Sequence, residues 1–305
     1  MRLLALLVSA VVVICALSLK SPIAHKARGG GRVGGLFAGG NANQYTSSNV
    51  VETRNVNGLQ YGMKMRNLPG TDLLVSELCL GTMMYGEQMN KAQSIAQLDK
   101  ATKEYGINFI DCAESYPVPS APSTTGRTES IIGDWMKSAG NREDVVISTK
   151  VCGYSKEITW CRSGEEATRV NRKQVIEAVD NQLRRLGTDY IDLLQIHWPD
   201  RYVPLFGSPD YLYELERSDS TPVKEQLEIM QELIQSGKVR HFGLSNETPY
   251  GLGEFVTTAK LLDLPKPCVT QNAYNLLCRN DFDTGMVEAC SPANGDVGLL
   301  GEFIV

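Results

Sequence analysis

Four side chains that could act together on a carbonyl group lie at or just beyond the ends of three short apolar segments. Asp111 ends the first segment, and Tyr116 follows in the next loop. Lys150 follows the second segment, and His197 follows the third. If the three segments are neighbouring parallel strands, the four side chains meet at one rim, where a (β/α)8 barrel keeps its chemistry.

The chemistry expected of this set is proton donation to an oxygen while a hydride adds to carbon. The phenol of Tyr116 is a poor acid, because its ordinary pKa is about 10, but the ammonium of Lys150 beside it would lower that pKa. Asp111 would keep Lys150 charged and oriented, and the imidazole of His197 would hydrogen-bond a substrate oxygen. A protein side chain cannot supply hydride, so the arrangement implies a nicotinamide cofactor.

Each of the four residues also has an ordinary structural role open to it. Asp111 could cap a helix, Tyr116 could be exposed in its proline-rich loop, Lys150 could be solvated, and His197 could pack beneath Trp198. A Schiff-base aldolase that uses Lys150 as nucleophile is a further alternative. It needs a lysine of lowered pKa, whereas a carboxylate such as Asp111 would raise that pKa. The joint placement at the ends of three consecutive segments favours the functional interpretation.

Strands and helices alternate along the chain after residue 61. Apolar periodicity predicts helices over residues 91–105, 128–139, 173–186, 222–236 and 250–262. Core strands are predicted at residues 79–83, 108–111, 145–149, 191–196, 239–245, 269–272 and 297–305. The turn signal at residues 69–72 predicts an N-terminal β-hairpin ahead of them. The expected fold is an α/β barrel of the (β/α)8, TIM type that is incomplete, with seven core strands and the eighth missing.

The composition excludes several kinds of partner and site. The chain has 305 residues, a net charge of −5 and 42% hydrophobic residues. The acidic balance gives no reason to expect a nucleic-acid partner. The 8 cysteines are scattered without a C-x-x-C pair or a His/Cys cluster, which predicts reduced structural thiols and no metal site. Cys152 and Cys161 flank one loop and could pair, although nothing in the sequence requires it.

The first 60 residues are typical of a targeting leader. Residues 3–19 form an uncharged apolar run, which predicts a signal peptide over residues 1–20 or, alternatively, a retained membrane anchor. Residues 21–60 are basic and Gly/Ser-rich, with no acid before Glu52, which resembles the transit segment of some algal plastid proteins. We expect passage through the secretory route to an organelle, with the plastid favoured over secretion or membrane anchoring. The mature domain, residues 61–305, is not expected to contact a membrane unless the apolar run is retained.

Several motifs occur in a fixed order along this domain. They are Leu80-Gly81-Thr82-Met83, Asp111-Cys112-Ala113-Glu114-Ser115-Tyr116, Ser148-Thr149-Lys150, Gln195-Ile196-His197-Trp198-Pro199, Gly243-Leu244-Ser245-Asn246-Glu247 and Gln271-Asn272-Ala273-Tyr274-Asn275. From about residue 61 onward, the chain resembles the aldo-keto reductase superfamily, and its Tas-like branch in particular. The resemblance implies a (β/α)8 barrel that uses NADPH to reduce a small-molecule aldehyde or ketone to an alcohol.

The resemblance also implies roles for individual residues. It makes Tyr116 the proton donor, tuned by Asp111 and Lys150, with His197 orienting the carbonyl. It places three residues, Ser245, Asn246 and Gln271, at the nicotinamide carboxamide, where an amide needs both donors and acceptors to fix its orientation. Gly81 and Thr82 would lie near the nicotinamide ribose.

The end of the sequence departs from the family pattern. Family members continue past the seventh strand with an aromatic residue that stacks on the nicotinamide, a pyrophosphate loop, an eighth strand and a basic phosphate site. Here residues 298–300 are followed by Gly301-Glu302-Phe303-Ile304-Val305. We therefore expect a C-terminally truncated barrel with two open strand edges. The alternative function is a catalytically impaired barrel that acts as a binding or regulatory subunit.

Overall fold

The structure, a computed structural model, describes residues 62–164, 166–205, 210–279 and 282–302. It also describes the backbone of two strands, β1 (Val13–Leu17) and β2 (Thr53–Arg54). Most of the predicted signal segment at 1–20 and transit segment at 21–60 lies outside the described residues, so those expectations stay predictions.

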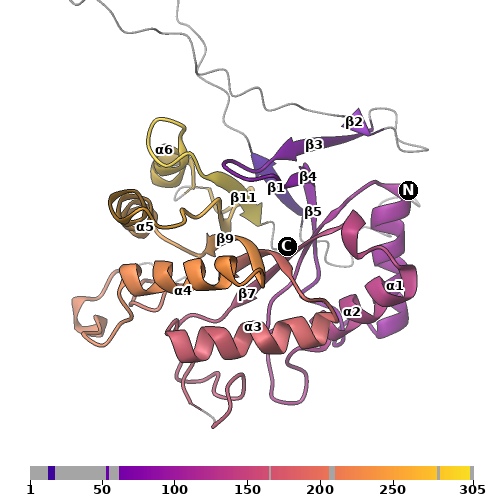
Figure 1. Ribbon diagram of the computed structural model, residues 1–305, viewed down its shortest axis with the longest axis horizontal. Coiled ribbons are helices and arrows are strands. Elements are labelled where there is room, and N and C mark those ends of the chain that lie inside the picture. The colour runs from indigo at the N-terminus through magenta and orange to yellow at the C-terminus, as the bar shows by residue number, and fades with distance from the viewer. Residues whose placement is uncertain are drawn as a thin grey trace, which may run out of the picture.

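Seven parallel strands form the centre of the domain, with helices outside them (Figure 1). The strands are β5 (Leu78–Gly81), β6 (Phe109–Asp111), β7 (Val146–Val151), β8 (Ile191–Ile196), β9 (Val239–Ser245), β10 (Val269–Ala273) and β11 (Gly298–Glu302). The helices are α1 (Lys91–Asp99), α2 (Arg127–Ala139), α3 (Arg172–Leu186), α4 (Val223–Gln235), α5 (Pro249–Leu262) and α6 (Val287–Cys290). Short helical turns lie at Lys100–Glu104, Arg142–Asp144, Tyr213–Leu215 and Phe282–Met286. The predicted α/β alternation is therefore confirmed, whereas α6 and the short turns at Arg142–Asp144, Tyr213–Leu215 and Phe282–Met286 were not predicted.

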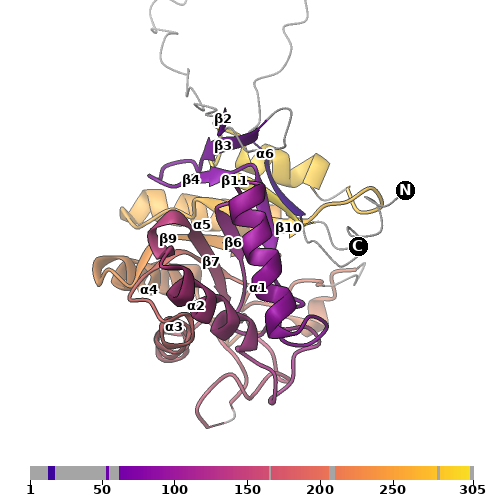
Figure 2. The same cartoon turned by 90° about the vertical axis from the view of Figure 1, so that its right-hand side faces the viewer.

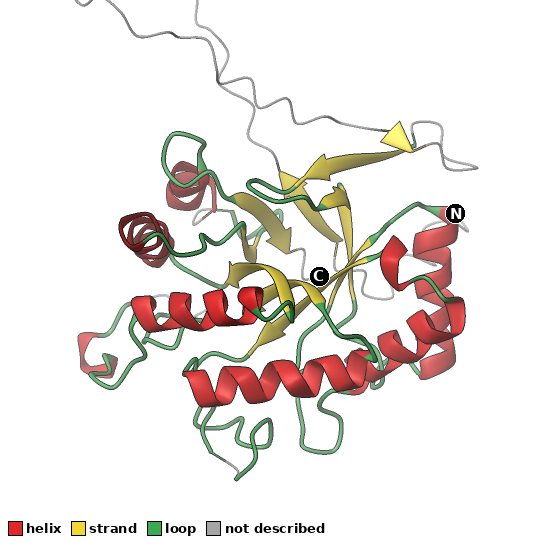
Figure 3. Ribbon diagram, in the orientation of Figure 1, coloured by secondary structure: helices red, strands yellow, loops and turns green. Residues whose placement is uncertain are grey.

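Helices α1 to α5 pack in chain order around the outside of the strands, each against the next, as the secondary-structure colouring of Figure 3 shows. Strand neighbours also follow chain order from β5 to β11. This is the arrangement expected when each parallel strand returns through a right-handed helical crossover.

Strand β1 occupies the position between the first and last parallel strands. It runs antiparallel to β11 on one side and to β5 on the other, so the ring of strands is closed. The expectation of two open edges is therefore wrong for the described strands, although seven parallel strands are present as predicted. The sequence analysis missed β1 because an apolar run near an N-terminus has the same composition as a signal peptide.

Side chains on each strand alternate between the barrel interior and the helix layer. On β7, Ile147 packs in the outer core with the helices, whereas Val146 belongs to a second cluster inside the barrel. Other members of this inner cluster come from neighbouring strands: Cys79, Phe109, Leu193, Val269 and Leu300. The next inward position on β7 is Ser148, which begins a polar layer above the apolar one. The interior is thus apolar near the start of the strands and polar near their ends.

A hairpin closes the apolar end of the barrel. Strand β3 (Met63–Asn67) pairs antiparallel with β4 (Leu74–Ser76), as predicted, and β2 adds to its other edge. Three hairpin side chains, Leu68, Leu73 and Val75, join the inner apolar cluster. Figure 2 shows this small sheet at one end of the molecule, away from α3 and α4. The opposite rim is left for the loops that follow the parallel strands.

Local sequence signals set the helix ends. Asn171 precedes α3, and its side chain accepts a hydrogen bond from the backbone N–H of Gln174, which satisfies one of the free donors at the helix start. Gly140 and Gly187 end α2 and α3 in the left-handed conformation, which glycine adopts without strain. No helix in the described residues is long and apolar enough to cross a membrane.

Close packing of α2 against the end of α3 generates a stability prediction. A Cβ atom added at Gly133 would lie 2.5 Å from the carbonyl oxygen of Arg185, whereas one added at Gly253 in α5 would meet nothing within 4 Å. Both changes gain helix propensity of about 1 kcal/mol, but only the first forces backbone apart. We expect Gly133→Ala to lower the free energy of unfolding by about 1–3 kcal/mol and Gly253→Ala to leave it unchanged or raise it. Urea denaturation of both variants checks this, and equal stabilities would contradict the packing.

Candidate active site

The four predicted residues meet at the rim where β6, β7 and β8 end. Asp111 is the last residue of β6, and His197 directly follows β8. Lys150 lies within β7, which continues to residue 151, so the strand is longer than predicted and carries Lys150 inside it. Tyr116 lies in the loop after β6, with its side chain only 5% exposed. The structure therefore brings together the whole set that the strand-end pattern selected.

A buried ion pair lies at the centre of this set. Lys150 Nζ is 2.5 Å from Asp111 Oδ2 and also donates to the Cys112 carbonyl at 2.9 Å. Burial alone lowers the pKa of Lys150, but the charges of Asp111, Tyr116 and Glu302 outweigh it, so the pKa is raised above its ordinary value. Lys150 is therefore a charged ammonium at neutral pH. This state is the opposite of what a Schiff-base nucleophile requires.

The phenol of Tyr116 packs between this ammonium and the imidazole. Lys150 Nζ lies 5.0 Å from the Tyr116 ring centroid, and the Tyr116 and His197 rings meet edge to face at 5.6 Å. Burial raises the pKa of Tyr116, and the Lys150 charge and hydrogen bond oppose that effect without cancelling it. The expectation of a net lowered pKa is therefore wrong, because desolvation outweighs the ammonium here. The phenol keeps its proton at neutral pH.

His197 is neutral in this environment. Burial and the Lys150 charge both lower its pKa well below the ordinary value. Its ring lies 4.8 Å from the Trp198 ring, and its Nδ1 atom has no hydrogen-bond partner among the described residues. A neutral imidazole has one donor and one acceptor nitrogen, so it can hydrogen-bond an oxygen without adding charge.

The polar layer beneath the rim contains three groups that sequence reasoning missed. Gln195 Nε2 donates to Ser148 Oγ and to Gln271 Oε1, both at 2.8 Å, and Ser148 Oγ donates to Asp111 Oδ1 at 3.1 Å. Glu302 accepts from Gln271 Nε2 at 3.3 Å. The signal that could have found Ser148 and Gln195 is strand alternation, since Ser148 lies two residues before Lys150 on β7 and Gln195 lies two residues before His197, which directly follows β8.

Glu302 adds a second carboxyl group to the site, beside that of Asp111. Burial raises the pKa of Glu302, Lys150 lowers it, and Asp111 raises it again, so the net shift is upward. Its charge in turn raises the pKa values of Tyr116 and Lys150. No motif singled this residue out, because its partners come from distant strands.

The residues expected near a nicotinamide lie at the ends of β5, β9 and β10. Ser245 is buried, and Asn246 adopts a left-handed backbone with φ of 51°. Asn246 Nδ2 donates to the His197 carbonyl at 2.9 Å and to Ser245 Oγ at 3.2 Å. Gln271 is fully buried, with its amide bonded inside the polar layer. Ser245 and Asn246 therefore lie on the His197 side of the rim, whereas the Gln271 amide lies in the polar layer beneath it.

Thr82 and Gly81 lie on the other side of the rim, where β5 ends. The Thr82 hydroxyl donates to the Asp111 carbonyl at 2.7 Å, and the Thr82 backbone N–H donates to the same oxygen at 3.1 Å. These bonds attach the end of β5 to the end of β6. No group of three or more His, Cys, Asp or Glu residues that could hold a metal ion occurs in the part of the chain that the structure describes.

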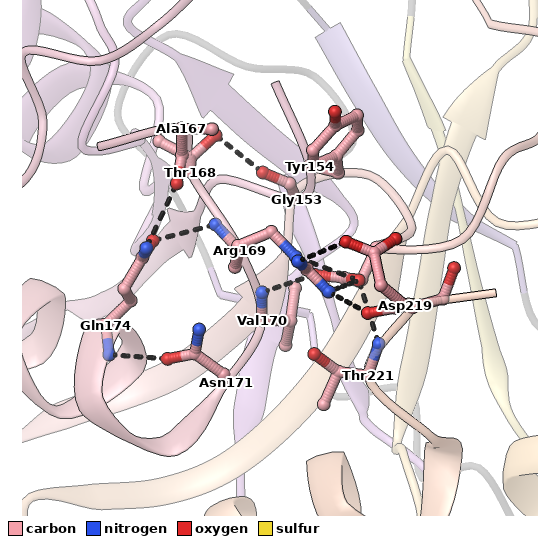
Figure 4. Close-up of polar contacts among 12 residues, drawn as sticks. Gly153, Tyr154, Ala167, Thr168, Arg169, Val170, Asn171, Gln174, Asp219 and Thr221 are labelled. Atoms are coloured by element: carbon pink, nitrogen blue, oxygen red, sulfur yellow. Dashed lines mark hydrogen bonds and ion pairs between the residues drawn. The ribbon is translucent and has the colours of Figure 1, made fainter. Parts of the chain in front are cut away.

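A carboxylate-centred clasp joins the loops that follow β7 and β8 (Figure 4). The buried Asp200 accepts from Arg169 Nε and Nη2, both at 3.0 Å, and from the backbone N–H groups of Val170 at 2.8 Å and Thr221 at 2.9 Å. Asp219 pairs with the outer side of Arg169 at 3.1 Å. The chain segment that follows His197 is thereby attached to the segment that precedes α3.

A close backbone approach supports the same region. A Cβ atom added at Gly153 would lie 1.8 Å from the Trp198 carbonyl oxygen, so only glycine fits there. Trp198 Nε1 donates to the Tyr154 carbonyl at 2.9 Å. The backbone at Trp198, directly after His197, is therefore packed against the backbone at Gly153, three residues after Lys150.

The hydrogen bonds that Asp200 accepts generate a prediction about the free energy of unfolding. Asp200→Asn removes the charge and places an amide donor against donors, so we expect the free energy of unfolding to fall by about 2–4 kcal/mol. Asp219→Asn is the matched control, because its side chain is 67% exposed and should matter by less than about 0.5 kcal/mol. Urea denaturation checks both variants. Similar stabilities for the two would contradict a clasp centred on Asp200.

Known proteins share this sequence and architecture. A family model described as "Aldo/keto reductase family" matches residues 77–302. Protein tas of Escherichia coli (strain K12) is 41% identical over 229 residues, which are 74% of this chain and 64% of that protein. An aldo-keto reductase of Babesia bovis is 44% identical over 162 residues, covering 51% of this chain and 56% of its own. The crystal structure of the thermostable aldo-keto reductase Tm1743 with the inhibitor epalrestat has a TM-score of 0.56 at 27% identity, covering 77% of this chain and 70% of that one.

The chain thus spans less than two thirds of the length of these curated relatives. The match of the family model nevertheless extends over well more than half of the 305 residues. It includes the strand ends that carry Asp111, Lys150 and His197, together with Tyr116. On this basis, the chain belongs to the aldo/keto reductase family.

Proposed function

We propose that the protein reduces an aldehyde or ketone to an alcohol, with the proton supplied by Tyr116 and the hydride by NADPH. The observation that carries this proposal is the packing of one phenol between an ammonium and a neutral imidazole at one rim. Lys150 Nζ lies 5.0 Å from the centre of the Tyr116 ring, and the centres of the Tyr116 and His197 rings are 5.6 Å apart. Membership of the aldo/keto reductase family supports the same reaction class.

Each protein group has one task in this reaction. His197 donates a hydrogen bond to the substrate carbonyl oxygen and orients it toward Tyr116. Tyr116 transfers its hydroxyl proton to that oxygen as negative charge develops on it. The resulting phenolate is stabilised by the ammonium of Lys150, whose own charge is maintained by Asp111. Burial of the set strengthens these interactions, because little water competes for them.

The rim contains groups that fit a nicotinamide, which when bound supplies the hydride. Gln195 Oε1 and His197 Nδ1 are buried atoms without hydrogen-bond partners among the described residues. Unsatisfied buried polar atoms are rare, and at a rim they are typical of a site that a ligand completes. Ser245 and Asn246 lie beside them and offer hydroxyl and amide groups to the carboxamide. NADPH in preference to NADH rests on the family resemblance.

The substrate is proposed to be a small carbonyl compound with an aromatic or apolar part. The Tyr202 and Tyr211 rings lie 5.2 Å apart, centre to centre and tilted by 56°, in the segment between β8 and α4, and the Tyr211 ring lies 5.7 Å from that of Tyr213. Aromatic side chains of this kind bind planar or apolar groups. The notion of a barrel that only binds or regulates a partner would leave the Tyr116, Lys150 and His197 packing without a task.

Replacement of the phenol tests the proposal most directly. We expect Tyr116→Phe to lower the rate of carbonyl reduction by about 10²–10⁴-fold, because the acid is removed while the ring remains. Binding of NADPH should persist, since the ring packing against Lys150 is kept. NADPH oxidation with a panel of aldehydes and ketones measures the rate, and quenching of protein fluorescence measures binding.

Tyr85→Phe is the matched control for this change. Tyr85 is also buried, and its hydroxyl has no hydrogen-bond partner among the described residues, so its loss should leave turnover unchanged. Equal rates for Tyr116→Phe and the parent protein would exclude Tyr116 as the proton donor. Absence of NADPH binding by the 305-residue chain would remove the reductase proposal for this form and favour a regulatory role.

We also propose, from the sequence alone, that the N-terminal leader directs the protein to an organelle such as a plastid. This proposal competes with the structure at one point, because cleavage after residue 17 would remove β1 and leave β11 and β5 without their shared neighbour. A fluorescent fusion carrying residues 1–60 should enter the organelle if the leader functions. An N-terminal sequence of the mature protein that retains residues 13–17 would instead favour the strand and exclude a cleaved signal peptide.

A further inference from the structure

The loop that carries Tyr116 remains hydrogen-bonded to β7 beyond the end of β6. The Glu114 N–H donates to the Lys150 carbonyl at 3.1 Å, which continues the parallel ladder between the two strands. The Cys152 N–H, two residues further along the chain from Lys150, donates to the Glu114 carboxylate at 2.6 Å. The loop turns here, where the Tyr116 N–H donates to the Ala113 carbonyl at 3.2 Å. Glu114 therefore lies at the point where the chain leaves β7 and turns toward the phenol.

A buried arginine fixes the carboxylate of Glu114. Arg162 Nη1 donates to Glu114 Oε2 at 2.7 Å, and Arg162 Nη2 donates to Glu114 Oε1 at 2.8 Å, which is a bidentate geometry. The two side chains are 1% and 3% exposed, so little water competes for these bonds. Arg162 in turn donates to Gln174 Oε1 at 3.2 Å and to the Cys161 carbonyl at 2.9 Å. Since Gln174 lies in α3, the carboxylate is attached to that helix as well as to β7.

The charge of Glu114 is part of this attachment. Burial raises the pKa of Glu114, but the charge and hydrogen bonds of Arg162 outweigh burial, so the pKa lies below its ordinary value. A neutral side chain at this position would leave the buried Arg162 guanidinium without its counter-charge, which is strongly destabilising for the local structure. The turn that precedes Tyr116 would then be held less firmly to both β7 and α3.

We propose that Glu114 is a positioning residue for proton donation, because its carboxylate, bound by Arg162, fixes the turn that places the Tyr116 phenol beside Lys150. The proposal rests on the proposed function, in which Tyr116 is the proton donor. Only two residues separate Glu114 from Tyr116, so a change in the turn moves the phenol relative to Lys150 Nζ, which lies 5.0 Å from the ring centre. A displacement of about 1 Å between reacting groups costs about 10²-fold in rate.

A second buried carboxylate provides a matched control at the opposite end of the barrel. Asp192 accepts from the backbone N–H of Ile147 on β7 at 3.0 Å and from two arginine side chains at 2.7 and 2.5 Å. It is 1% exposed. Asp192 thus combines the same kinds of donor as Glu114, but it lies where β7 and β8 begin. Its loss should weaken the fold without moving the Tyr116 loop.

Steady-state kinetics of two variants tests the catalytic part of the proposal. Glu114→Gln keeps the side-chain shape and removes the charge, so we expect kcat for carbonyl reduction to fall about 10²-fold while the KM for NADPH is unchanged. The solvent deuterium isotope effect on kcat should increase, because transfer of the phenol proton limits the rate more strongly. Asp192→Asn should lower the urea midpoint, as Glu114→Gln does, but leave kcat and the isotope effect unchanged. Equal losses of kcat in the two variants would overturn the proposal.

Hydrogen exchange measured by mass spectrometry tests the anchoring without relying on turnover. A peptide covering residues 113–118 should exchange faster in Glu114→Gln than in the parent protein, and at the parent rate in Asp192→Asn. Arg162→Lys keeps the positive charge but loses the bidentate fork, so its exchange and its kcat should lie between those of Glu114→Gln and the parent. This second variant applies the same test if Glu114→Gln does not fold.

The two measurements separate this proposal from the proposed function. Unchanged exchange of residues 113–118 in Glu114→Gln and in Arg162→Lys would overturn the role of Glu114 whatever the protein catalyses. Faster exchange in a protein whose parent form reduces no carbonyl would remove the proposed function, and with it the catalytic role of Glu114. Faster exchange together with an unchanged kcat would show that the turn does not position the phenol, and would overturn this proposal alone.

Discussion

The ion pair between Lys150 and Asp111 is the interaction on which the rest of the site depends. Two opposite charges inside a barrel are tolerated only if their remaining hydrogen-bonding capacity is satisfied, because an unpaired buried charge costs several kcal/mol. Asp111 accordingly accepts from Ser148, and Lys150 donates to the Cys112 carbonyl. The polar layer that Gln195 completes is thus a requirement of the pair, and it begins where the apolar cluster of the barrel ends.

The loops around this pair are held by further buried carboxylates. Glu114 binds Arg162 and the peptide after β7, and Asp200 binds Arg169 and two backbone N–H groups after β8. A carboxylate that accepts several fixed donors loses less on desolvation than one that accepts a single donor. These contacts hold the peptides next to the site without contacting Tyr116. Rigid support of this kind is what proton transfer between positioned groups demands.

The barrel is closed by one antiparallel strand, β1, between the first and last parallel strands. Seven strands are parallel and return through helices, whereas β1 enters antiparallel and fills the remaining place between β11 and β5. A strand edge in this position must be paired or covered, because its free N–H and C=O groups would otherwise recruit another chain. The same apolar residues would serve a leader peptide equally well, since both uses select uninterrupted hydrophobic character.

The sequence by itself determined the alternation of strands and helices, the hairpin at the closed end and the set Asp111, Tyr116, Lys150 and His197. These follow from local rules: apolar periodicity, glycine stops, and the convergence of parallel strand ends at one rim. Only the tertiary structure decided that burial affects the pKa of Tyr116 more than the ammonium of Lys150 does. The same holds for the presence of Glu302 in the site and for the closure of the ring of strands by β1. Each of these depends on groups far apart in the chain and on how much water is excluded between them. No local sequence pattern predicts which distant groups come together or how much water is excluded between them.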